Sequence, residues 1–129
     1  MLTRHPEFLR YVLIADAVAS GATGALMIAG AGFLSGLLSL PGALLFEAGL
    51  LLVPYVLFVL WTATRRTIPV KPVWLIIACN TLWTLASVIL LAGWIAPNAL
   101  GIAFVILQAA TVGLLGFAQY LGLGRRAVA

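Results

Sequence analysis

Two carboxylates lie inside stretches that are otherwise strongly apolar, and they are the first candidates for chemistry. Asp16 and Glu47 each interrupt a hydrophobic segment, and ionisable groups in hydrocarbon are costly and usually mark function. Asp16 follows Arg10 by six residues, or ~9 Å of helix, whereas Glu47 precedes Arg65 by eighteen residues, or ~27 Å from the same side. Because the two carboxylates occupy different levels, they predict neither an acid–base pair nor a shared metal site within one monomer.

Neutral polar residues occupy the depths between the two carboxylates. We expect Asn80 near the level of Asp16 and Gln108 near the level of Glu47. If these faces converge, they form a polar ladder that could carry protons, ions or a small polar solute. The alternative is that the neutral groups only hold helices together, or bond back to their own backbone. The intramembrane candidates are Asp16, Ser20, Thr23, Glu47, Asn80, Thr84, Ser87, Gln108 and Thr111.

The two carboxylates call for different explanations. No Lys or Arg lies inside any apolar segment to pair with Glu47. We therefore expect Glu47 to face the bundle interior and to be protonated, to reach water at the outer side, or to meet an amide such as that of Gln108. Asp16 has a milder explanation, since it could reach the cytoplasmic interface or pair with Arg10.

Four apolar segments must position these residues. The chain has 129 residues, of which 64% are hydrophobic and only 8% charged, and its mean hydropathy is +1.21. A helix needs about 20 residues to cross the hydrocarbon core, and strands would need alternating polarity. The pattern predicts an all-α fold, a single domain that is a bundle of four transmembrane helices, with spans at about 8–30, 42–62, 73–94 and 99–121.

The basic residues give the orientation. All seven lie before the first segment, between the second and third, or after the fourth, which is one side of the predicted bundle. The connections between the first and second segments and between the third and fourth carry none. Because Lys and Arg stay in the cytoplasm during insertion, we expect a bacterial inner-membrane protein with both termini on the cytoplasmic side. An alternative is a cleavable signal peptide ending near Ala17-Val18-Ala19, although Asp16 interrupts its apolar core. The basic residues are Arg4, Arg10, Arg65, Arg66, Lys71, Arg125 and Arg126.

The chain also repeats itself weakly. Asp16, Ser20 and Thr23 share the i, i+4, i+7 spacing of Asn80, Thr84 and Ser87, which places each set on one helix face. The sets therefore predict two tandem helical hairpins, related by a pseudo-twofold axis along the membrane normal. On this hypothesis Asp16 superposes on Asn80, and Glu47 lies near Gln108. Coincidence among apolar segments is the alternative.

Several chemistries are excluded by composition. His5 is the only histidine and Cys79 the only cysteine, so the sequence predicts no metal site and no haem within one monomer. We find no Ser–His or Cys–His arrangement and no phosphate-binding loop. The sequence therefore predicts no catalytic residue, no cofactor and no enzyme. The net charge of +4 sits at predicted cytoplasmic helix ends, so it indicates a lipid bilayer rather than nucleic acid as the partner.

A resemblance covers most of the chain. Asp16-Ala17-x-x-Ser20-Gly21-x-x-Gly24, Asn80-x-x-Trp83-x-x-x-Ser87, Gln108-Ala109 and Tyr120-Leu121-Gly122-Leu123 resemble small uncharacterised four-helix bacterial inner-membrane proteins, whose outline is similar to that of DoxX-like proteins. This resemblance implies the fold but no activity. The small multidrug-resistance transporters have a similar size, but the context of their first-helix glutamate is missing here.

Two functions follow from these observations. The first is an accessory or assembly subunit that packs on membrane-protein partners, or on a second copy of itself, through small-residue faces such as Ala17-x-x-x-Gly21, Ser20-x-x-x-Gly24 and Ala109-x-x-x-Gly113. The alternative is a small oligomeric transporter or channel that uses Glu47 and the polar ladder.

Overall fold

A computed structural model describes residues 7–128, without the side chains of Trp94 and of residues 125–128. The described chain is helical with no strands, which confirms the predicted all-α four-helix bundle. Four of its helices are long and apolar enough to cross a membrane, so the chain has the build of a multi-pass membrane protein. They are α1 (Phe8–Ala29), α3 (Gly42–Ala63), α4 (Val70–Ile89, continued by a π-helical turn at Leu90–Trp94) and α5 (Ala99–Val128).

The helix boundaries lie close to the predicted spans, and their ends have local causes. α3 begins after Pro41, and α4 begins after Pro69 rather than at the expected residue 73. Proline is tolerated at these starts because its missing N–H would have no partner there. Asn98 caps α5, since its Oδ1 accepts a hydrogen bond of 2.9 Å from the backbone amide of Gly101. Pro54 lies inside α3, as the sequence indicates.

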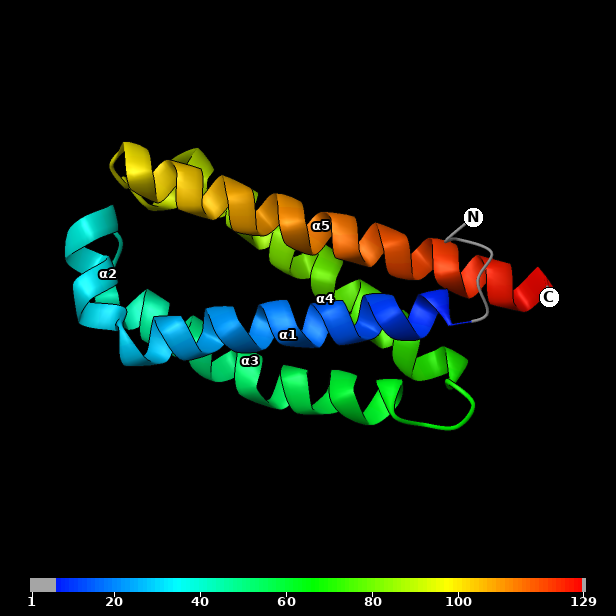
Figure 1. Ribbon diagram of the computed structural model, residues 1–129. Helices are drawn as coiled ribbons and strands as arrows, with labels where there is room; N and C mark the ends of the chain where they lie inside the picture. The colour runs from blue at the N-terminus through cyan, green and yellow to red at the C-terminus, as the bar shows by residue number, and fades with distance from the viewer. Residues whose placement is uncertain (1–6, 129) are drawn as a thin grey trace.

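One helix was not predicted. α2 (Ala31–Leu38) occupies part of the expected connection between the first two spans. With eight residues, it is too short to cross a membrane. It turns back toward the start of α5 (Figure 1). There the backbone N–H of Asn98 donates a hydrogen bond of 3.2 Å to the carbonyl of Leu38. Its buried residues Leu34 and Leu38 join a core that includes Leu45, Leu52 and Val105.

The long helices form two hairpins. α1 packs along α3, and α4 packs along α5, while α1 also contacts α5 and α3 barely touches α4. We call the end of the bundle at which α1 begins and α5 finishes the Phe8 end, and the opposite end the α2 end (Figure 1). The hairpins lie close together at the Phe8 end, where one core joins all four helices through residues such as Leu13, Val59, Ile76 and Leu123.

Candidate functional site

A buried polar cluster connects the four long helices. We call it the Asp16 cluster, and it consists of Asp16 and Ser20 from α1, Tyr55 from α3, Asn80 from α4 and Gln119 from α5. Asp16 and Gln119 are completely buried, and Asn80 and Ser20 are nearly so. Because bilayer lipid offers polar groups no partners, these side chains must satisfy one another.

The Asp16 carboxyl group is the centre of this cluster. Its Oδ2 accepts hydrogen bonds from the amide nitrogens of Asn80 at 3.1 Å and Gln119 at 2.7 Å. The Tyr55 hydroxyl lies 2.6 Å from the same oxygen and 2.8 Å from Asn80 Oδ1. Ser20 donates 3.0 Å to Oδ1. Both carboxyl oxygens are therefore occupied by neutral partners from all four long helices.

Asn80 lies at the level of Asp16, as the sequence predicts, but the proposed explanation of Asp16 was wrong. Asp16 neither reaches the interface nor pairs with Arg10. The Arg10 guanidinium instead binds Glu7 Oε2 at 2.7 Å and donates to the backbone carbonyls of Ala63, Arg65 and Arg66, at and just beyond the end of α3. That contact leaves Asp16 without a cation among the described residues and fastens the start of α1 to the α3–α4 connection.

Two members of the cluster were missed in the sequence. Gln119 precedes Arg125 by six residues, the same distance by which Asp16 follows Arg10. Counting depth from each flanking arginine would have placed Gln119 beside Asp16. Tyr55 gives a weaker signal, because a tyrosine in mid-span differs little from other aromatic residues of an apolar helix.

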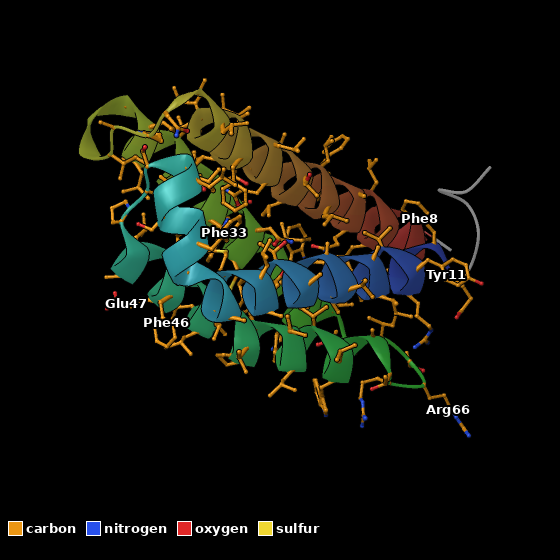
Figure 2. The ribbon with its side chains drawn as sticks, turned by 60° about the vertical axis from the view of Figure 1, so that its left-hand side comes forward. Phe8, Tyr11, Phe33, Phe46, Glu47 and Arg66 are labelled. Carbon is orange, nitrogen blue, oxygen red and sulfur yellow. The ribbon has the colours of Figure 1, made fainter. Side chains whose placement is uncertain are left out.

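Glu47 is the main correction. It does not face the interior or meet Gln108; it lies on the exposed surface of α3, pointing away from the bundle beside the exposed Phe46 (Figure 2). Among the described residues it has no hydrogen-bond partner. The physical reason is its rotational position, because Leu45, Gly49 and Leu52 form the buried face of α3 and Glu47 lies opposite. It stands only five residues into α3, ~7.5 Å from the start of the helix, so its carboxylate can reach the membrane boundary.

Gln108 belongs to a second polar cluster, closer to the α2 end, together with Trp83 and Ser87. Gln108 Oε1 accepts a hydrogen bond of 2.7 Å from the Trp83 indole nitrogen, and the Gln108 side-chain amide donates one of 3.0 Å to Ser87 Oγ. No hydrogen bond joins this cluster to the Asp16 cluster in the described residues. The predicted ladder is therefore two separate groups rather than one continuous path.

The remaining hydroxyls of the ladder mostly satisfy their own helices. Thr84 and Ser87 donate to the carbonyls of Asn80 and Trp83, four residues earlier. Thr111 is exposed and donates in the same way to Leu107. For these three residues the structure supports the interpretation that neutral hydroxyls bond back to the helix backbone. Thr23 is half-buried and has no hydrogen bond among the described residues.

A cavity of about 580 Å³ lies between the two hairpins. α1, α3, α4 and α5 all contribute to its wall, which is mainly apolar. The exposed Leu51 of α3 and Leu82 of α4 border it, at the face where α3 and α4 barely touch. The cavity is therefore open toward the surrounding membrane. Its polar lining residues are Ser20, Thr23, Tyr55, Cys79, Asn80, Trp83, Gln108 and Thr111.

Asp16 is separated from this cavity by its own partners. It does not line the cavity, whereas Ser20, Tyr55 and Asn80 do. Within the described part of the chain, no Asp, Glu, Lys, Arg or His side chain lines the cavity. In the described residues, no group of three His, Cys, Asp or Glu side chains could hold a metal ion. The site therefore presents hydrogen-bonding groups and apolar surface, but no formal charge.

Comparisons with known proteins add nothing to this geometry. No protein-family model, no curated protein and no solved structure matches the chain. The interpretation of the site therefore rests on its physical chemistry.

Proposed function

We propose that this chain is a non-enzymatic, multi-pass protein of the bacterial inner membrane that binds a small neutral molecule dissolved in the bilayer. The observation that carries the proposal is the uncharged cavity of about 580 Å³ between the hairpins. Ligand sites typically have volumes of about 300–1,000 Å³, with apolar walls and a few placed polar groups. An ion entering this cavity would lose its hydration without meeting an opposite charge.

Partner packing has less support, because the small-residue faces are used inside the chain. A methyl group added at Gly24 would lie 3.1 Å from Leu52 and 3.4 Å from the carbonyl of Gly49, so this glycine lets α1 approach α3. Gly113 faces Thr84 of α4, and Ala17 and Ala109 are buried. These contacts within the chain leave less of the small-residue faces for other proteins or for a second copy. The transporter hypothesis keeps support only as the movement of a neutral solute through the same cavity. In that form Glu47 has no role.

The first test concerns ligand binding. Ala19 lines the cavity, whereas Ala22 on the same helix is exposed and does not. We expect a neutral aryl diazirine to photolabel cavity peptides containing Tyr55 or Trp83 saturably in the reconstituted protein. Ala19→Phe should reduce this saturable labelling at least fivefold by filling the space, and Ala22→Phe should leave it unchanged. Labelling that rises linearly with probe concentration at every peptide would contradict a binding site.

The second test concerns orientation. We infer that the Phe8 end is cytoplasmic, because the basic residues gather there. In a Cys79→Ala background, Ser39→Cys should react with a membrane-impermeant maleimide in intact cells, whereas Lys71→Cys should react only after the membrane is permeabilised. The reverse pattern would place the termini outside. Ala127→Cys, beyond the described side chains, gives an independent check, because it should also react only after the membrane is permeabilised.

We also infer that the two hairpins are an internal repeat centred on the Asp16 cluster. The contact of Tyr55 with Asp16 and the hydrogen bond between Asn80 and Gln119 both span 39 residues. One offset of 64 residues therefore relates Asp16 to Asn80 and Tyr55 to Gln119. The expected correspondence of Glu47 with Gln108 does not support the repeat, since one is exposed and the other joins the Trp83 cluster.

A further inference from the structure

Thr23 differs from the other threonines of the long helices. Each of the other four donates a hydrogen bond to the carbonyl four residues earlier; they are Thr62, Thr81, Thr84 and Thr111. Thr23 lines the cavity but makes no such bond, and it has no other hydrogen-bond partner among the described residues. A threonine hydroxyl has one proton to donate. Inside a bilayer, leaving that proton unused is unfavourable unless a ligand or water accepts it.

The other strong donors around the cavity are already in use. The hydroxyls of Ser20 and Tyr55 bind within the Asp16 cluster. The Trp83 indole donates to Gln108, whose own amide donates to Ser87 and to the carbonyl of Val105. The Asn80 amide donates to Asp16 and Gln119. The Cys79 thiol is only a weak donor. Thr23 is therefore the strong donor that the described cavity wall leaves for a ligand.

The lack of charge narrows the ligand further. Among the side chains that the structure describes, neither a basic one that could bind a phosphate or carboxylate nor an acidic one that could bind an ammonium group lines the cavity. The Asp16 carboxyl group is completely buried and does not line the cavity, so it offers no exposed negative charge to a cation there. A charged phospholipid headgroup is excluded by the same argument, because it would be desolvated without a counter-ion.

We propose that the ligand is a neutral, mostly apolar molecule bearing a carbonyl oxygen, and that this oxygen accepts a hydrogen bond from Thr23 Oγ1. The proposal rests on the proposed function and adds the ligand's chemical class and its polar anchor. Thr23 lies seven residues from Asp16, ~10.5 Å along α1, so the polar end of the ligand sits away from the Asp16 carboxyl group. Its apolar part faces Leu52, Phe104 and Leu115, which line the same cavity.

The test compares two neutral aryl diazirines with the same skeleton, one bearing a ketone and the other a methylene in its place. Concentration-dependent photolabelling of the full-length reconstituted protein gives an apparent affinity for each probe. We expect the ketone probe to bind about fivefold more tightly, the effect of one net hydrogen bond. Thr23→Val keeps the side-chain shape and should abolish this preference, and Thr23→Ser should retain it.

Thr111→Val is the matched control. Thr111 also lines the cavity, but its hydroxyl already donates to its own helix, so the ketone preference should persist in this variant. Saturable labelling by both probes with a preference that Thr23→Val leaves intact would overturn the Thr23 proposal and leave the binding function standing. Absence of saturable labelling by either probe would overturn both.

The lipid must be varied as well, because phospholipid esters also carry carbonyl groups. Ether-linked phospholipid bilayers contain no ester carbonyl. An equal preference for the ketone in ester- and ether-linked bilayers assigns the anchor to a free small molecule. A preference that strengthens only in ether-linked bilayers shows that lipid esters compete for Thr23, and makes the lipid's own carbonyl the natural acceptor.

Discussion

Asp16→Ala is expected to lower the free energy of unfolding by roughly 2–3 kcal/mol, with a clear fall in the midpoint of thermal unfolding in detergent. The alanine removes the acceptor shared by Ser20, Tyr55, Asn80 and Gln119. Hydrogen bonds between membrane helices contribute about 0.6 kcal/mol each on average, and buried groups left without partners add to the loss. Because Asp16 connects all four long helices, the loss should appear as global unfolding.

Two variants separate this effect from the loss of a carboxyl group as such. Asp16→Asn should retain most of the stability, because its carbonyl oxygen can replace Oδ2 and its amide can donate to Ser20 Oγ. Glu47→Ala removes the exposed carboxylate of α3 and should change the midpoint little. Equal destabilisation by the Asp16→Ala and Glu47→Ala variants would mean that the Asp16 cluster does not hold the bundle together.

Gly101→Ala is expected to destabilise the junction of α2 with α5 by about 2 kcal/mol, within the range for overpacked sites. An added methyl group would overlap the backbone carbonyl oxygen of Leu38 and lie 2.5 Å from Pro97 Cβ. The clash with a backbone oxygen cannot be relieved by rotating a side chain. It would separate α2 from α5 and break the hydrogen bond from the backbone N–H of Asn98 to the carbonyl of Leu38. Thermal unfolding in detergent measures the effect.

Gly36→Ala provides the control within α2. Gly36 is exposed, and an added methyl group would meet nothing within 4 Å. Alanine is the better helix former, so this variant should be neutral or more stable by up to about 1 kcal/mol. A stable Gly101→Ala protein would show that the close contact between α2 and α5 is dispensable.

The fold was predictable because the requirement to cross a bilayer is read directly from segment length and polarity. Which face of each helix is buried was not predictable. In a soluble helix, the polar side shows which face is outside, but lipid is as apolar as a helix interior, so Leu51 and Leu52 look equivalent in sequence although only Leu52 is buried. Depth counting therefore brought Asn80 to Asp16 correctly but could not show that Glu47 points outward.

The rest of the site depends on contacts between distant segments. Tyr55 and Gln119 acquire their roles only when α3 and α5 are rotated toward α1, and no local pattern specifies that rotation. α2 was missed because eight apolar residues between two spans carry no signal that distinguishes a short helix from a loop. The cavity arises where α3 and α4 fail to pack, and a lack of packing leaves no mark in a sequence.

The pairing of the helices into two hairpins has a consequence for biogenesis. Each hairpin can enter the bilayer as it leaves the translocon, and the first already buries Gly24 against Gly49 before the second is made. Apolar contacts with lipid would then compete with apolar contacts between hairpins. The hydrogen bonds of Asp16 to Asn80 and Gln119 have no such competitor. In a first hairpin still waiting for its second half, the Asp16 carboxyl group keeps its contacts with Ser20 and Tyr55 but lacks both amide donors. This shortfall is a mark by which quality-control proteases could tell a nascent chain from a finished one.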